Sequence, residues 1–123
     1  MTGVQTCAFP ICLGGAPVVL GFRSERHAEA AALLPEAEVV VEPRLVTELV
    51  EQGHHVLACG PEPMLHAVAA QCPDAQLAWE APMACGFGAC YGCVVEIRGR
   101  LRRLCVEGPV LAAADVGAAE MAA

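Results

Sequence analysis

The segment ACGFGACYGCVV, residues 84–95, constrains this chain more than any other stretch. It places three cysteines and three glycines in ten positions and then continues with β-branched valines. Three thiols on so flexible a backbone are expected to surround a bound group. A fourth thiol from elsewhere in the chain is then needed to complete the set of ligands.

A hairpin can supply that further thiol. The stretch VVEIRGRLRRLCV, residues 94–106, contains Arg98-Gly99, which fits a two-residue turn between two strands. Such a turn pairs Ile97 with Arg100 and Cys93 with Leu104, so Cys105 arrives beside Cys93. The predicted metal ligands are Cys85, Cys90, Cys93 and Cys105, spaced C-x4-C-x2-C-x11-C.

This spacing predicts a [2Fe-2S] cluster, because the plant-type iron-sulfur sequence is C-x4-C-x2-C with a distant fourth cysteine. Cluster sulfides accept hydrogen bonds from backbone N–H groups, and side chains would obstruct those bonds. Glycines at 86, 88 and 92 remove the side chains and permit positive φ.

Other centres remain as alternatives. A four-cysteine zinc module used for protein contacts usually has two C-x2-C pairs, whereas this loop has one, Cys90 and Cys93. Disulfides would need an oxidising compartment, and no basic segment precedes the first apolar residues as in a signal peptide. The thiols are therefore expected to be reduced and the protein cytoplasmic. No histidine lies near the loop, which argues against a Rieske centre.

Charge narrows the classes of partner. The formal net charge is −7, and the seven basic residues are all arginine, so a nucleic-acid partner is disfavoured.

No apolar run approaches the roughly 18 residues of a membrane span. Four of the arginines lie in the segment that brings in Cys105, where they could stabilise a reduced cluster, dock an acidic partner or simply face water: Arg98, Arg100, Arg102 and Arg103.

Before the loop, short apolar runs alternate with helical patterns. Strands are expected at 17–22, 38–42, 54–58 and 75–79, and helices at 25–34, 44–52 and 64–72, the first of them N-capped by Ser24. Strict alternation of this kind predicts an α/β fold with a parallel sheet covered by helices. After Leu111 the alanine-rich tail is weakly helical.

Three strings carry a family resemblance: LACGPEPMLHAVA, MACGFGACYGCVV and LCVEGPVLAAADV. They resemble, in this order, the end of the electron-transfer subunit of type B dihydroorotate dehydrogenase, over residues 16–117. The resemblance implies a partial nucleotide-binding domain of the ferredoxin-reductase type followed by a small [2Fe-2S] module. It also implies electron transfer between the FMN of a catalytic partner subunit and FAD and NAD, in pyrimidine biosynthesis and in a heterotetramer.

The resemblance also gives domain boundaries. Residues 1–11 resemble the translation of a sequencing adapter, residues 12–80 form a partial NAD-binding domain, and residues 81–123 form the cluster module. FAD is expected to bind in a barrel that precedes these parts in the family. No residue here is expected to act as acid, base or nucleophile, and the chain alone is not expected to be catalytic. The alternative function is a gamma-type subunit of another oxidoreductase, such as a hydrogenase, sulfide dehydrogenase or glutamate-synthase-like enzyme.

The nucleotide site is expected at CGPEPM, where a strand ends and a helix begins. By resemblance, the residues that approach the nicotinamide are Cys59, Gly60, Pro61 and Met64. The alternative is a buried thiol before an ordinary helix start.

The remaining polar and thiol residues are expected to be structural. Cys12 and Cys72 are expected to be buried, and Trp79, next to Glu80, is expected to pack. The histidines, which have no spacing typical of a metal or catalytic site, are His27, His54, His55 and His66.

Overall fold

The computed structural model describes residues 17–51 and 53–116. They form two compact units, divided between Val50 and Glu51. The segment that resembles a sequencing adapter, residues 1–11, lies outside the described residues, and so does Cys12.

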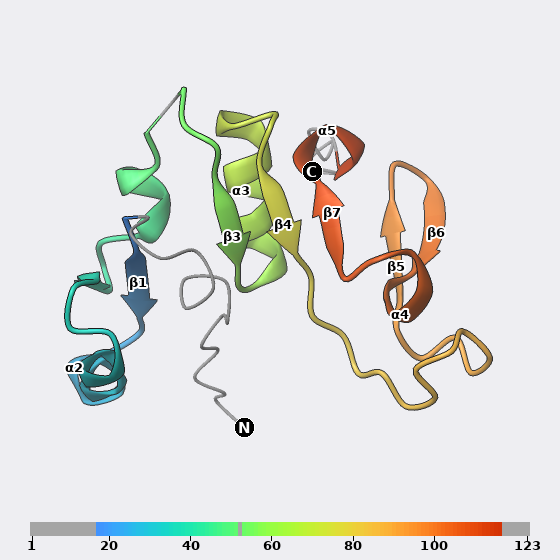
Figure 1. Cartoon of the computed structure of the whole chain (residues 1–123), viewed down its shortest axis with the longest axis horizontal. Helices are drawn as coiled ribbons and strands as arrows, with labels where there is room; N and C mark the ends of the chain where they lie inside the picture. Colours follow the sequence, from blue (N-terminus) through green and yellow to red (C-terminus); the bar gives the residue numbers. More distant parts are fainter. Residues whose placement is uncertain (1–16, 52, 117–123) are drawn as a thin grey trace. The chain divides into compact units, whose positions relative to one another are not determined.

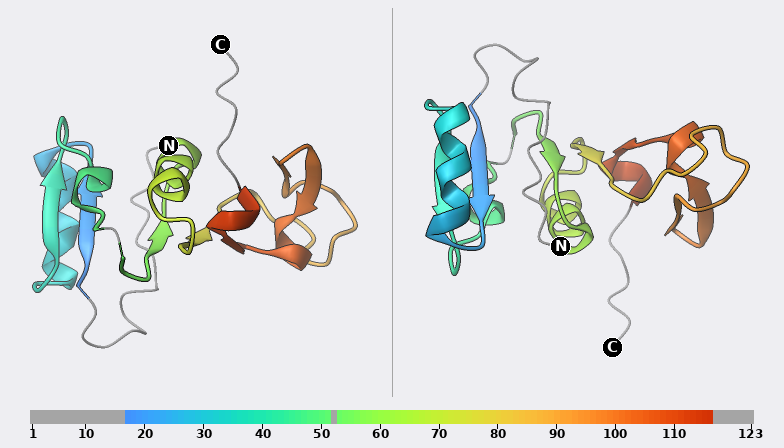
Figure 2. Two further views of the ribbon diagram at one scale, coloured as in Figure 1. Left: turned by 90° about the horizontal axis from the view of Figure 1, so that it is seen from above. Right: turned by 90° about the horizontal axis from the view of Figure 1, so that it is seen from below.

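The first unit is a β-α-β arrangement. Strand β1 (Val19–Phe22) pairs in parallel with β2 (Glu38–Val41), and Val19 lies opposite Glu38. Figure 2 shows the helical segment between them, α2 (Glu25–Ala28) and η1 (Glu29–Leu33), against one face of the pair. A short 3-10 helix, η2 (Val46–Leu49), follows β2.

The two predicted helices of this unit are shorter and tighter than expected. The first begins after Ser24 as predicted, but from Glu29 it continues as a 3-10 helix. Its alanine-rich sequence offers few large side chains for packing, and Leu33 is 79% exposed. The second spans only Val46–Leu49, where β-branched residues follow Pro43 and the Glu48 carboxylate accepts a hydrogen bond from the Leu45 N–H at 3.0 Å.

The second unit contains a mixed sheet in the order β3-β4-β7. Strands β3 (Leu57–Cys59) and β4 (Gln76–Ala78) are parallel, and they are connected by helix α3 (Glu62–Gln71). Strand β7 (Val110–Ala112) pairs antiparallel with β4 and leads into α5 (Ala113–Val116). Figure 1 shows α3 lying against β3 and β4.

A hairpin completes this unit. Strands β5 (Val94–Ile97) and β6 (Arg100–Arg103) form a separate antiparallel sheet, and α4 (Leu104–Glu107) follows directly. The ladder ends at Val94 opposite Arg103, so Cys105 lies on α4 and not on a strand as the sequence analysis expected. The hairpin itself is confirmed, because Ile97 lies opposite Arg100.

The predicted α/β fold class is confirmed in outline, with two differences. The described strands form separate sheets instead of one continuous parallel sheet. Strand β7 was not expected, since Val110–Ala112 lies beside the alanine-rich tail and has no alternating pattern. The fully buried large side chains come from α3, β4 and the hairpin region: Leu65, Leu77, Leu104, Val68 and Cys93.

Leu77 lies on the central strand of the mixed sheet and is completely buried. We expect Leu77→Ala to lower the free energy of unfolding by about 2–5 kcal/mol, because it removes buried methyl groups and leaves a cavity. Chemical denaturation of this variant measures the loss. Leu101→Ala, at a side chain 69% exposed in the same unit, is the control and should change the free energy of unfolding by about 0.5 kcal/mol or less. Equal losses in the two variants would contradict this description of the core.

Candidate metal centre

The loop between β4 and β5 carries the first three cysteines of the predicted ligand set. Cys85 is half-buried and Cys90 is exposed, whereas Cys93, which directly precedes β5, is only 2% exposed. The loop therefore runs from the surface into the core at the start of the hairpin.

The hairpin turn brings the fourth cysteine to the third. Arg98 and Gly99 both have positive φ, 51° and 70°, which is the conformation of a type I′ turn. The Leu104 N–H donates to the Cys93 carbonyl at 3.2 Å, and the Cys105 N–H donates to the Cys93 Sγ at 3.4 Å. Cys93 and Cys105 are thus brought together as expected, through the backbone that follows β6.

The first two cysteines form a second pair. The Cys90 N–H donates to the Cys85 Sγ at 3.5 Å, and the Gly92 N–H donates to the Cys90 Sγ at 3.4 Å. Three of the four sulfurs thus accept a hydrogen bond from a backbone N–H, as the loop of an iron-sulfur site requires.

The thiol acidities follow from these contacts. Hydrogen bonds from the backbone N–H groups, that of Cys90 first and then that of Phe87, lower the pKa of Cys85 to about 6. The Cys105 N–H, and then the Cys105 thiol, lower the pKa of Cys93. The pKa of Cys105 is raised, chiefly because its thiol hydrogen-bonds to Cys93.

The two pairs also act on each other. The charge of Cys85 opposes the ionisation of both Cys93 and Cys105, although in each case its effect on the pKa is smaller than that of the contact within the pair. Within residues 17–51 and 53–116, no three Cys, His, Asp or Glu side chains are grouped as ligands of a single metal ion. The thiols meet instead as two pairs, Cys85 with Cys90 and Cys93 with Cys105.

Two glycines of the loop hold conformations that side chains resist. Gly86 and Gly88 have φ of +72° and +85°. A Cβ on Gly88 would also lie 2.8 Å from Val106 Cγ2. Gly92 has no such φ, but a Cβ there would lie 3.4 Å from the Cys90 Sγ. Gly86 and Gly88 therefore serve the backbone conformation, and Gly92 serves a close approach to sulfur.

Arg103 fastens the loop to the hairpin, a role that the sequence analysis did not identify. Its Nη1 donates to the Gly88 carbonyl at 3.3 Å, and its guanidinium carbon lies 5.6 Å from the centre of the Tyr91 ring. The Arg103 N–H donates to Glu107 Oε2 at 2.9 Å, and this contact, helped by the charges of Arg102 and Arg103, lowers the pKa of Glu107. In the sequence, the i,i+4 spacing of Arg103 and Glu107 was the available signal for the ion pair between them.

The expected nucleotide residues lie where β3 ends and α3 begins. Pro61 precedes the helix, and its carbonyl accepts a hydrogen bond from the Met64 N–H at 2.9 Å. A Cβ on buried Gly60 would lie 2.5 Å from Met64 Cε. The Cys59 thiol donates to Glu80 Oε1 at 3.8 Å. The four residues are therefore close together, and their contact with a nicotinamide stays a prediction.

The remaining candidates have structural contacts. Cys72 and Trp79 are 5% and 3% exposed, so their predicted burial is confirmed. The His66 ring meets Trp79 edge-on at 5.3 Å, and His27 Nδ1 lies 2.8 Å from Ser24 Oγ.

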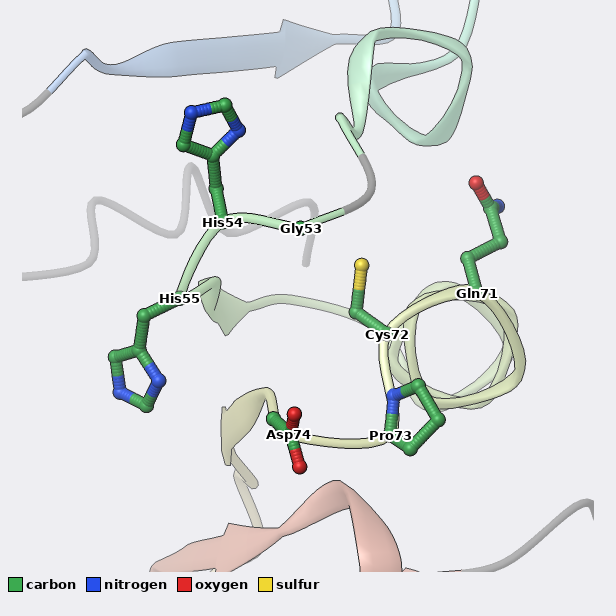
Figure 3. Close-up of a pocket in the computed structure, with 7 residues that line it drawn as sticks. All are labelled: Gly53, His54, His55, Gln71, Cys72, Pro73 and Asp74. Atoms are coloured by element: carbon green, nitrogen blue, oxygen red, sulfur yellow. The ribbon is translucent and has the colours of Figure 1, made fainter.

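A separate cavity of about 200 Å³ lies beside the end of α3. Figure 3 shows that the rings of His54 and His55, which line it, point away from each other. These side chains do not converge with Asp74 or Cys72 on a common centre, so the cavity offers no metal site.

Comparison with known proteins bears directly on the cysteine loop. Residues 80–117 match the family model of the iron-sulfur cluster binding domain of dihydroorotate dehydrogenase B. No helix within the described residues is long and apolar enough to cross a membrane.

Curated relatives agree with this match. The chain is 39% identical over 70 residues to the electron transfer subunit of dihydroorotate dehydrogenase B (NAD(+)) from Clostridium acetobutylicum, covering 54% of this chain and 28% of that protein. It is 47% identical over 62 residues to the subunit of the same name from Fusobacterium nucleatum, covering 48% and 24%. An Aquifex aeolicus homolog of the subunit is 44% identical over 64 residues, covering 50% and 26%. The chain thus spans less than a third of the length of these relatives.

A solved structure shows a similar fold. It is that of an NADH-dependent reduced ferredoxin-NADP oxidoreductase, with a TM-score of 0.53 and 21% identity, over 83% of this chain and 42% of that chain. Taken with the paired thiols, the comparisons show that residues 80–117 are similar to the iron-sulfur cluster binding domain of dihydroorotate dehydrogenase B, and that part of the chain is similar to its electron transfer subunits.

Proposed function

We propose that this chain transfers electrons through a [2Fe-2S] cluster between the FMN of a dihydroorotate dehydrogenase catalytic subunit and FAD and NAD. The proposed ligands are Cys85, Cys90, Cys93 and Cys105. The observation that carries the proposal is the arrangement of these thiols as two adjoining pairs with backbone N–H groups donating to sulfur.

The pairs fit the donor requirement of such a cluster, in which each of two irons takes two protein ligands. Cys85 and Cys90 would hold one iron, and Cys93 and Cys105 the other. Ligating thiols must be deprotonated, and the lowered pKa values of Cys85 and Cys93 favour that state.

When bound, a [2Fe-2S] cluster accepts and donates single electrons. This chain's residues position it. The Cys90, Gly92 and Cys105 N–H groups stabilise negative charge on sulfur by donating hydrogen bonds to it. Arg103 holds the loop through the Gly88 carbonyl, and exposed Cys90 places one side of the site at the surface, where a redox partner can approach.

The remaining parts of the proposal come from the relatives. Their name, electron transfer subunit of dihydroorotate dehydrogenase B (NAD(+)), supports a catalytic dihydroorotate dehydrogenase partner and NAD as the electron acceptor. A place in pyrimidine synthesis is part of the same proposal. We propose that this partner contains FMN and forms a heterotetramer with the full-length subunit in the cytoplasm. FAD would bind in a preceding domain, and NAD would approach the turn Cys59-Gly60-Pro61 and Met64 at the start of α3. The domain boundary at residues 80 and 81 is part of the same proposal.

Replacing Cys105 tests the ligand set. After anaerobic reconstitution, we expect Cys105→Ala to lose most of its iron and its visible absorption, because one iron would lack a thiolate. Cys72→Ala removes a buried thiol outside the loop and should keep the iron content of the unchanged chain. Equal iron loss in the two variants would refute the ligand assignment, and a colourless, zinc-loaded product would refute the redox function.

Replacing Gly88 tests the geometry of the loop. We expect Gly88→Ala to reduce iron content, since the new Cβ meets Val106 at 2.8 Å and Arg103 Nη1 at 3.3 Å. The matched control is Gly53→Ala, which has a similar φ of +89° but open space around the new Cβ. Both variants carry the backbone cost of positive φ, roughly 1 kcal/mol, so only the clash separates them. Iron content that falls equally in both would mean that loop geometry is not the cause.

Reduction by substrate tests the partner. The reconstituted chain is mixed without oxygen with an FMN-containing dihydroorotate dehydrogenase subunit and dihydroorotate, and its visible absorption and EPR signal are followed. We expect the absorption to bleach and the signal of a reduced cluster to appear. Cys105→Ala, carried through the same mixture, should give neither change. A chain that is reduced by dithionite but not by this mixture would keep its cluster assignment and lose the proposed partner.

A further inference from the structure

The β5–β6 hairpin presents two different faces. Side chains alternate along each strand, and directly opposed residues share a face. Val94 and Arg103 are opposed at the end next to the cysteine loop, where Arg103 reaches the Gly88 carbonyl. On the other face Ile97 is opposed to Arg100, and the next pair on that face is Val95 and Arg102.

That second face borders a cavity of about 300 Å³. It is lined by Ile97, Arg98, Arg100 and Arg102 of the hairpin and by Asp115 of α5, both within the second unit (Figure 1). Ile97 is only 5% exposed, so it forms an apolar part of the lining under the arginine side chains. The volume is at the lower end of the range for sites that bind small ligands.

The positive charge in this cavity is only partly compensated. Arg102 Nη1 lies 3.8 Å from Glu107 Oε1, whereas no ion pair of the described residues involves Arg98 or Arg100. Asp115 lines the same cavity, and none of these ion pairs joins it to an arginine. In a chain of net charge −7, three arginines around one cavity are a local concentration of positive charge.

Arg98 occupies an unfavourable backbone position. It has φ of 51° at the first central residue of the turn, where asparagine, aspartate or glycine is strongly preferred. A side chain held in the left-handed region costs stability, and such residues concentrate at functional sites. Binding of a ligand by the Arg98 guanidinium at the cavity would offset this loss of stability.

We propose that this cavity binds a small phosphate ester that carries hydroxyl groups, such as a sugar phosphate. Arg98 and Arg100 bind the phosphate through their planar guanidinium groups, which match its oxygens in bidentate geometry. Asp115 accepts a hydrogen bond from a ligand hydroxyl, which explains an acidic residue in a cavity otherwise lined by arginine. This site lies on the hairpin face opposite Arg103, and no residue of the cysteine loop lines it.

The test is isothermal titration of the full chain with inorganic phosphate and with ribose 5-phosphate, at low ionic strength. We expect both to bind, and ribose 5-phosphate to bind more tightly. Arg100→Gln should weaken both by roughly tenfold, the effect of losing hydrogen bonds to a charged group. Asp115→Asn should weaken ribose 5-phosphate more than inorganic phosphate, because only ribose 5-phosphate has a sugar hydroxyl that can donate to Asp115 while its phosphate is bound by the arginines.

Two further variants separate function from folding. Arg98→Asn places a preferred residue in the turn, so it should raise the free energy of unfolding while weakening both ligands. Arg26→Gln removes the same charge from an exposed position in the first unit and should leave both affinities unchanged.

Several results would overturn the proposal. They are no binding of either ligand at millimolar concentration, unchanged affinity in both Arg98→Asn and Arg100→Gln, or an equal loss in Arg26→Gln, which would indicate a general effect of charge. An equal effect of Asp115→Asn on the two ligands would overturn the sugar phosphate as the ligand class. Because the readouts are binding and unfolding, failure here leaves the iron-content tests of the cluster unaffected.

Discussion

The site depends on the register of one hairpin. The turn at Arg98 and Gly99 sets Ile97 opposite Arg100, and this pairing continues to Val94 opposite Arg103. The next hydrogen bond, from the Leu104 N–H to the Cys93 carbonyl, places the Cys105 N–H 3.4 Å from the Cys93 Sγ. A slip of one residue would move every side chain of β6 to the other face and would take Cys105 away from Cys93. The proposed metal site of this chain therefore depends on turn geometry.

Backbone N–H groups define the rest of the site more than side chains do. The loop has no regular secondary structure, and positive φ at Gly86, Gly88 and Tyr91 turns its peptide groups. N–H groups then point at sulfur, and their effect is visible in the lowered pKa of Cys85 and Cys93. An isolated loop of this kind would lose much conformational entropy on ordering. Arg103 compensates by fastening it to the hairpin at the Gly88 carbonyl and the Tyr91 ring.

The sequence was sufficient for features that depend on local patterns. The Arg98-Gly99 dipeptide predicted the turn and the approach of Cys105 to Cys93, and the alternation of strands and helices predicted the parallel pairs. It failed where long-range packing decides. Strand β7 exists because its backbone completes the β4 edge, where the Trp79 N–H donates to the Pro109 carbonyl at 2.9 Å. No pattern within Val110–Ala112 reports that contact. Cys105 was placed next to the correct partner but in the wrong element, since the chain becomes helical at Leu104, whose side chain is completely buried.

The four hairpin arginines also differ in ways that the sequence could not show. From charge alone, all of them could stabilise a reduced cluster or face water. In the structure, Arg103 belongs to the loop face, shares Glu107 with Arg102, and positions the loop through the Gly88 carbonyl. Arg98 and Arg100 form no such ion pair within the described residues and border a cavity on the other face, next to Ile97. The alternation of a β-ribbon thus separates two roles that a linear run of arginines conceals: one arginine holds the thiol loop, and its neighbours are available to a ligand of opposite charge.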